Sequence, residues 1–169
     1  MNYQIPSYAP INGLQVAYET VGDGFPLLML HGFPRTRRSW QRISPYLKER
    51  FMIIAPDRRG YGDSDRGAPP ESYNNAMLAS EGIGMIDKLG IDTFMVVGHD
   101  KGMPTAARIA ADNPDRVLGA VLLDGMPEGA NVPRPPMHLS CKHGDTPPLT
   151  CGVRSSRTPR TMSMRNSPK

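Results

Sequence analysis

The chain has 169 residues, a length that allows one hydrophobic core, and a single domain is therefore expected. Its formal net charge of +4 is unevenly distributed, since residues 131–169 hold 7 of the 20 basic residues but only one of the 16 acidic residues, Asp145. Binding to nucleic acid and insertion into a membrane are not expected, because the basic segment has no aromatic residue to stack on bases and no apolar run is long enough to span a bilayer.

The first predicted elements are strands. Alternating apolar residues within 7–21 predict one or two antiparallel strands, joined at the hairpin-type turn signal Asn12-Gly13. Residues 25–30 form a continuous apolar run, which is typical of a strand buried on both faces of a parallel sheet.

A helix is predicted over residues 35–50. Ser39 is its expected N-cap, and Trp40, Ile43 and Leu47 would lie on one apolar face. The following apolar run, 51–55, predicts the next strand, and a polar loop rich in glycine comes directly after it.

The remaining pattern alternates between helices at 72–89 and 103–113 and strands at 93–97 and 117–123. Strands and helices that alternate with short connections indicate right-handed βαβ units. The expected fold class is α/β, with a mostly parallel sheet covered by helices on both faces. Ligands in such folds bind at the carboxyl ends of the strands.

One of those strand ends is a Gly-x-Asp-x-Gly turn, Gly98 to Gly102, between an apolar run and a predicted helix. A strand, a sharp turn with a glycine on each side, and a helix together predict a nucleophile elbow, with Asp100 exposed above the sheet. A simpler interpretation is that Asp100 only caps the helix, since aspartate is a favoured N-cap.

An aspartate at this position points to a particular chemistry. A carboxylate is already ionised at neutral pH. It suits attack on a saturated carbon that bears a leaving group, and it leaves an alkyl ester on the enzyme. Hydrolysis of that ester then requires a histidine that activates water, an acid that orients the histidine, and backbone N–H groups that hold the oxyanion.

These segments resemble the α/β-hydrolase superfamily, in its aspartate-nucleophile branch of epoxide hydrolases and haloalkane and haloacetate dehalogenases. The resemblance covers about residues 10–128. It rests on four segments: His31 to Pro34, Asp57 to Ser64, Gly98 to Gly102 and Asn113 to Val117.

The resemblance implies roles for particular residues. Asp100 would be the nucleophile, and the backbone N–H groups of Phe33 and Lys101 would form the oxyanion hole, with a cis peptide between Phe33 and Pro34 to aim the first of them. Asp124 would orient the catalytic histidine, although it is also a plausible turn residue at the end of a strand. No organic cofactor or metal is implied, and the expected partner is a small-molecule substrate.

Two histidines precede residue 130, and both are expected to be structural. His31 and His99 would pair their ring nitrogens with nearby backbone groups, and neither is assigned as the catalytic base. The sequence also departs from the branch after the nucleophile. Haloalkane dehalogenases and many epoxide hydrolases have tryptophan there, and haloacetate dehalogenases have two arginines, where this chain has Lys101 and Pro104.

A different composition begins after residue 130. Residues 1–130 are expected to be a partial hydrolase core that ends after its sixth strand. Residues 131–169, with seven prolines, are expected to be a disordered tail, which an out-of-frame reading would explain. The tail contains His138, His143, Cys141 and Cys151. Neither a disulfide framework nor a metal site is expected from these residues. The N-terminus has no signal-peptide pattern, so a cytoplasmic location is expected.

The functional prediction follows from these points. The chain is expected to be a hydrolase of epoxides or carbon–halogen bonds that lacks the catalytic histidine. It would therefore be inactive or limited to a single turnover. The alternatives are a non-catalytic remnant or interaction protein, and an enzyme that performs another carbon–heteroatom cleavage or ester chemistry.

Overall fold

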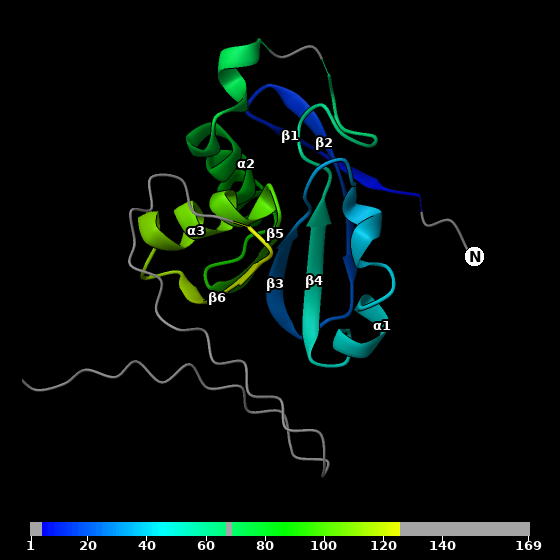
Figure 1. Cartoon of the computed structure of the whole chain (residues 1–169). Helices are drawn as coiled ribbons and strands as arrows, with labels where there is room; N and C mark the ends of the chain where they lie inside the picture. The colour runs from blue at the N-terminus through cyan, green and yellow to red at the C-terminus, as the bar shows by residue number, and fades with distance from the viewer. Residues whose placement is uncertain (1–4, 67–68, 126–169) are drawn as a thin grey trace, which may run out of the picture. The chain divides into compact units, whose positions relative to one another are not determined.

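The structure is a computed structural model that describes residues 5–66 and 69–125 (Figure 1). The predicted tail, with its histidines and cysteines, lies outside the described residues, as do residues 126–130. The predictions made for the tail therefore stay predictions.

Six strands form one mixed sheet in the order β1-β2-β4-β3-β5-β6. Their bounds are Ser7–Ile11 (β1), Leu14–Val21 (β2), Phe25–Leu30 (β3), Phe51–Pro56 (β4), Phe94–His99 (β5) and Val117–Leu123 (β6). The pairs β1/β2 and β2/β4 are antiparallel, whereas β3 pairs in parallel with β4 and β5, and β5 pairs in parallel with β6. The predicted α/β class with a mostly parallel sheet is confirmed.

The turn between β1 and β2 follows the prediction from Asn12-Gly13. Both residues have positive φ angles, 49° for Asn12 and 78° for Gly13. A two-residue hairpin requires this left-handed geometry, because it matches the twist of the two strands. The strands pair from Ser7 opposite Tyr18 to Ile11 opposite Leu14.

Helices cover both faces of the sheet, as predicted (Figure 1). On one face, α2 (Asn75–Lys88) and α3 (Gly102–Asp112) pack on a core that includes Leu28, Phe94 and Ile109. On the other face, the 3₁₀ helix η1 (Arg37–Trp40) and the short α1 (Ser44–Leu47) accompany a smaller core that includes Met29 and Trp40. Among the described residues, no helix combines the length and apolarity needed to cross a membrane.

The predicted helix over 35–50 is wrong, because η1 and α1 replace it. Pro45 occupies the first turn of α1. Proline has no N–H, and its ring would collide with the carbonyl group four residues earlier, so one helix cannot run through it. Ser39 lies inside η1, where its hydroxyl donates to the Thr36 carbonyl (2.8 Å), and it does not act as an N-cap. Trp40 is buried as predicted, but Ile43 is 45% exposed.

The predicted helix at 72–89 exists but begins later. Residues Pro70–Tyr73 form a second 3₁₀ turn, η2, and the α-helix starts at Asn75. Its N-cap is Asn74, whose side chain accepts a hydrogen bond from the Met77 N–H (2.9 Å). Gly82 lies within the helix without interrupting it. A Cβ there would lie 2.7 Å from Ile109 Cδ1, so the glycine allows close packing against α3.

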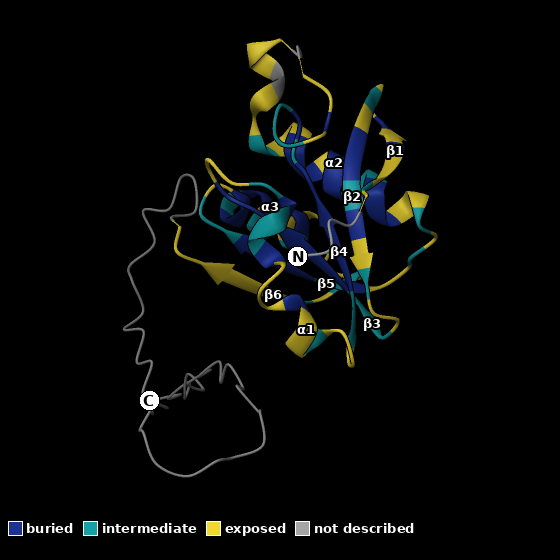
Figure 2. Ribbon diagram, turned by 90° about the vertical axis from the view of Figure 1, so that its right-hand side faces the viewer, coloured by how far each residue is buried: buried dark blue, intermediate teal, exposed yellow. Residues whose placement is uncertain are grey.

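The β6 edge of the sheet is exposed among the described residues. Leu118 is 63% exposed and Leu122 is 44% exposed, and Figure 2 shows the strand in the colour of exposed residues. Apolar side chains on an unpaired strand edge favour association with another strand.

Candidate active site

The turn between β5 and α3 has the geometry of a nucleophile elbow. Asp100 lies in this turn with a φ angle of 49°. A left-handed conformation costs a non-glycine residue roughly 1–2 kcal/mol, although aspartate tolerates it better than most residues. The conformation directs the Asp100 carboxylate out of the turn at the carboxyl ends of the parallel strands.

Two glycines make this sharp turn sterically possible. A Cβ on Gly98 would lie 2.4 Å from the Gly102 carbonyl oxygen and 2.6 Å from the Ala106 Cβ. A Cβ on Gly102 would lie 2.3 Å from the Leu30 carbonyl oxygen. The backbones of β5, α3 and β3 therefore approach too closely for any side chain at these two positions.

Replacing Gly98 by alanine is expected to destabilise the chain by about 2–3 kcal/mol, because the new methyl group overlaps the backbone of α3. The measurement is the free energy of unfolding from urea titrations. Gly90→Ala is the control, since a Cβ there meets nothing within 4 Å and costs only the positive φ of 68°, about 1 kcal/mol. Equal losses for the two variants would contradict the steric explanation.

Two backbone N–H groups contact the Asp100 carboxylate. The Phe33 N–H donates to Asp100 Oδ1 at 2.8 Å, and the Lys101 N–H faces the same carboxylate and lowers its pKa. The Lys101 and Phe33 N–H groups, in that order, hold the pKa of Asp100 below its ordinary value of 3.8, although partial burial acts in the opposite direction. The carboxylate is therefore ionised at neutral pH.

The loop after β3 is shaped to bring the Phe33 N–H to this carboxylate. A Cβ on Gly32 would lie 2.5 Å from the Asp100 Cβ, so only glycine allows the two loops to approach in this way. The Phe33–Pro34 peptide is cis, as the resemblance implies. Asp100 thus bonds to a residue far away in the sequence, which a simple cap of α3 would not do.

The buried ion-pair network around Arg37 fixes the same loop. Arg37 is only 1% exposed, and its guanidinium pairs with Asp57, with Glu19 (3.0 Å) and with Asp63 (2.8 Å). Its backbone N–H donates to Asp57 Oδ1 at 2.7 Å, and Asp57 Oδ2 accepts from the Asp63 N–H at 2.9 Å. The network therefore joins the loop after β3 to the loop after β4.

His31 has a structural role, as predicted. Its Nδ1 lies 2.9 Å from the Gly32 carbonyl oxygen, and its Nε2 accepts a hydrogen bond from the Arg58 N–H at 3.0 Å. These contacts require the neutral ring with its proton on Nδ1. Burial lowers the pKa of His31, which agrees with the neutral form. Both ring nitrogens are occupied, so His31 is not available as a base.

No backbone partner of the His99 ring is found among residues 5–66 and 69–125, so this part of the prediction is not supported there. Its Nε2 faces Asp124 Oδ2 at 3.9 Å, and its ring contacts Trp40 edge to face with centroids 6.4 Å apart. Strand alternation places His99 on the same face as Val97, beside apolar side chains rather than backbone groups. Asp124 has a side chain that is 91% exposed, and its role in orienting a catalytic histidine stays a prediction.

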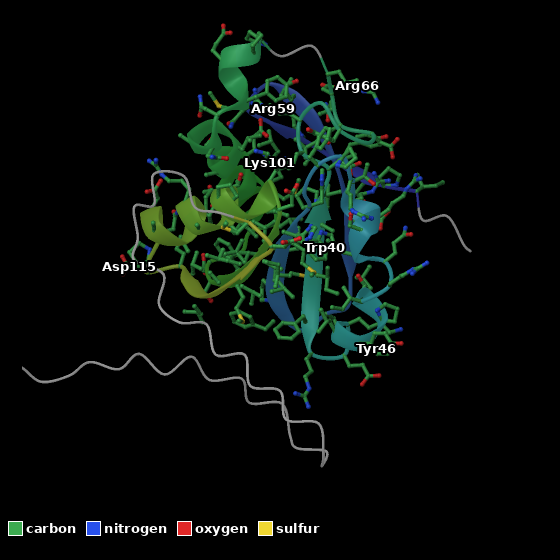
Figure 3. The ribbon with its side chains drawn as sticks, viewed as in Figure 1. Trp40, Tyr46, Arg59, Arg66, Lys101 and Asp115 are labelled. Atoms are coloured by element: carbon green, nitrogen blue, oxygen red, sulfur yellow. The ribbon has the colours of Figure 1, made fainter. Side chains whose placement is uncertain are left out.

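A cavity of about 430 Å³ lies over Asp100. The residues that give it its chemical character are Phe33, Arg58, Tyr61, Asp100, Lys101 and Pro104. Figure 3 labels Lys101 and Arg59, which also lines the cavity. No role was predicted for Arg58 or Arg59, and the signal that could have marked them is the pair of cations at the carboxyl end of a strand.

The chain matches known proteins over most of the described residues. A sequence model of the alpha/beta hydrolase fold family matches residues 26–141. The chain is 40% identical over 119 residues to a soluble epoxide hydrolase of Corynebacterium sp. (strain C12), an alignment that covers 70% of this chain and 41% of that protein. It is also 40% identical over 109 residues to a fluoroacetate dehalogenase of Burkholderia sp, which covers 63% of this chain and 36% of that protein.

Solved structures agree with the sequence matches. An epoxide hydrolase from Vigna radiata superposes with a TM-score of 0.69 at 29% identity, covering 75% of this chain and 42% of that chain. The chain therefore spans about two fifths of the length of the relatives it matches.

Proposed function

The chain belongs to the alpha/beta hydrolase family, and on that premise we propose that it forms the nucleophile-bearing part of a hydrolase of epoxides or carbon–halogen bonds. Its relatives include epoxide hydrolases and a dehalogenase, which act on small molecules. Asp100 is the proposed nucleophile, and the Phe33 and Lys101 N–H groups are the proposed oxyanion hole.

The observation that carries this proposal is the direction of the two N–H groups. Both contact the carboxylate of Asp100 itself. When one carboxylate oxygen attacks a carbon, an ester forms and the bond to the epoxide oxygen or halogen breaks, so the leaving atom takes the electron pair. Water then attacks the ester carbonyl, and the oxyanion forms on an oxygen of Asp100, where the N–H groups stabilise it.

The second step needs a base beside the ester. His31 has both ring nitrogens engaged. His99 directs Nε2 toward Asp124 and is not among the residues that line the cavity. Neither histidine in the described part of the chain is therefore positioned to activate water above Asp100. We propose that the 169-residue chain forms the ester faster than it hydrolyses it.

The test is to incubate the folded chain with a reactive epoxide, such as styrene oxide, and to record intact-mass spectra over time. A stable adduct of one substrate molecule is expected, and peptide mapping must assign it to Asp100, because Cys141 and Cys151 are also nucleophiles. Steady turnover without an adduct would contradict the single-turnover proposal. A folded chain that forms no adduct and no product would favour the non-catalytic alternative.

The pH dependence of adduct formation follows from the pKa of Asp100. Attack requires the ionised carboxylate, and the backbone N–H groups lower the pKa of Asp100 below 3.8. The rate is therefore expected to stay constant on acidification from neutral pH and to fall to half only below pH 3.8. Short incubations with circular dichroism as the control for folding provide the measurement. If the rate of adduct formation falls to half at a higher pH while the protein is still folded, another group controls the rate.

A further inference from the structure

No hydrogen bond or ion pair joins the side chain of Arg58 to another described residue. Arg58 follows β4, and its backbone N–H binds His31 Nε2, while its side chain lines the cavity over Asp100. Its Nε is buried without a hydrogen-bond partner. The neighbouring Arg59 differs, because its guanidinium pairs with the buried carboxylate of Glu81.

The residues that line the cavity carry more positive than negative charge. Glu81 neutralises the charge of Arg59. Arg58 and Lys101 also line the cavity, and the carboxylate of Asp100 can balance only one of these two positive charges. Burial lowers the pKa of Arg58, and the nearby Tyr61, Glu81 and Asp100 oppose this effect. An arginine nevertheless remains charged in proteins. A partly buried cation without a partner is costly, and an anion bound in the cavity would remove that cost.

Ester formation increases the excess of positive charge around the cavity. The carboxylate of Asp100 becomes neutral when its oxygen bonds to carbon, and its charge departs with the halide or passes to the epoxide oxygen. A second anionic group that stays on the substrate would keep Arg58 and Lys101 paired throughout the reaction. Arg58 and Lys101 would in turn offset the repulsion that such a negatively charged substrate meets at the anionic nucleophile.

We propose that Arg58, together with Lys101, binds a carboxylate group of the substrate, so that the enzyme prefers small carboxylated substrates such as haloacids or epoxy acids. This inference rests on the proposed attack by Asp100. The guanidinium provides parallel N–H donors that match a carboxylate, and the exposed ammonium of Lys101 adds a point charge. In the reaction of a haloacid, Asp100 bonds to the carbon, the carbon–halogen bond breaks, and the substrate carboxylate is unchanged.

Two matched probes test the inference. Chloroacetate and chloroacetamide share the reacting carbon and the leaving group, and they differ in charge. The rate of ester formation at Asp100 is measured by peptide mapping, and each rate is divided by the rate of the same probe with free acetate. The normalised ratio of chloroacetate to chloroacetamide is expected to exceed about tenfold, as one charged hydrogen-bonded contact provides.

Arg58→Gln is expected to lower this ratio about tenfold, whereas Arg58→Lys is expected to retain part of it. Arg66→Gln is the matched control, because Arg66 is an exposed arginine of the same loop that contacts the Gly62 carbonyl (3.3 Å) and is not among the cavity-lining residues (Figure 3). It should leave the ratio unchanged. An unchanged ratio in a folded Arg58→Gln chain, or a ratio near one in the unmodified chain, would overturn the inference while the proposed function stands.

A binding measurement separates the two proposals. In the Asp100→Asn chain, titration of chloroacetate followed by ligand-observed NMR is expected to give an affinity that Arg58→Gln lowers about tenfold, while chloroacetamide binds equally weakly to both. Binding that depends on Arg58, without any adduct on the unmodified chain, would overturn the role of Asp100 and retain the anion site. If the chain shows neither Arg58-dependent binding of chloroacetate nor an adduct, both proposals are overturned.

Discussion

Replacing Asp100 by asparagine is expected to abolish adduct formation with epoxides and haloacids, lowering its rate by at least about 1,000-fold. The amide has nearly the shape of the carboxylate, and its oxygen can still accept the Phe33 N–H that contacts Asp100 at 2.8 Å. The fold should therefore remain, while the anionic oxygen that attacks carbon is lost. Intact-mass spectra of the folded variant after incubation with styrene oxide provide the measurement.

The matched control for this variant is Asp115→Asn, since Asp115 is an exposed aspartate that is not among the cavity-lining residues (Figure 3). It should form the adduct at the rate of the unmodified chain. Peptide mapping at one-dalton accuracy must exclude deamidation, which would restore the aspartate at position 100. An adduct that persists in verified Asp100→Asn protein would show that another nucleophile reacts, and the elbow would lose its proposed role.

The elements that sequence analysis predicted correctly are those whose cause is local. Asn12-Gly13 predicted a hairpin because a two-residue turn needs positive φ angles, and both residues have them. The glycines at 98 and 102 predicted a sharp strand-to-helix turn, and a Cβ at either position would collide with backbone. The continuous apolar run over residues 25–30 predicted a strand buried on both faces. Helices do cover both faces of the sheet, with a core on each side.

The misplaced helix shows where periodicity fails. The apolar spacing of Trp40, Ile43 and Leu47 fits one helical face, but it carries no information about Pro45, which removes an N–H at the centre of the segment. The delayed start of α2 has a similar origin, since Asn74 provides a cap that the apolar pattern does not reveal.

The parts of the site that sequence analysis missed depend on contacts between distant segments. No role was predicted for Arg37, which falls within the predicted helix over 35–50, but it is buried among carboxylates from β2 and from the loop after β4. Arg58 lies within the segment Asp57 to Ser64 on which the resemblance rests, and only the fold brings it to the cavity that Asp100 also lines. His99 was expected to contact backbone, but its position depends on Asp124 and Trp40. Ion pairs between segments have no periodic signature in the sequence.

Replacing Arg37 by leucine is expected to destabilise the chain by about 3–5 kcal/mol, because it leaves buried carboxylates without their cation. Asp57 is fully buried and Glu19 is 8% exposed, so water cannot replace the guanidinium. Domains of this size typically have only about 5–15 kcal/mol of total stability, and a large fraction of the variant should be unfolded under mild denaturing conditions. Urea titrations followed by circular dichroism provide the measurement.

The variant Arg42→Leu is the control, because Arg42 is exposed and its loss should change the free energy of unfolding by no more than about 0.5 kcal/mol. Adding Asp57→Asn to Arg37→Leu should recover part of the lost stability, because the double variant no longer buries that uncompensated charge. If the losses in free energy of unfolding caused by Arg37→Leu and Asp57→Asn simply add in the double variant, Arg37 acts through packing alone. Coupling between the two positions would show that this ion pair holds together the loops that carry Phe33 and Arg58, so the geometry around Asp100 depends on a charge balance outside the cavity.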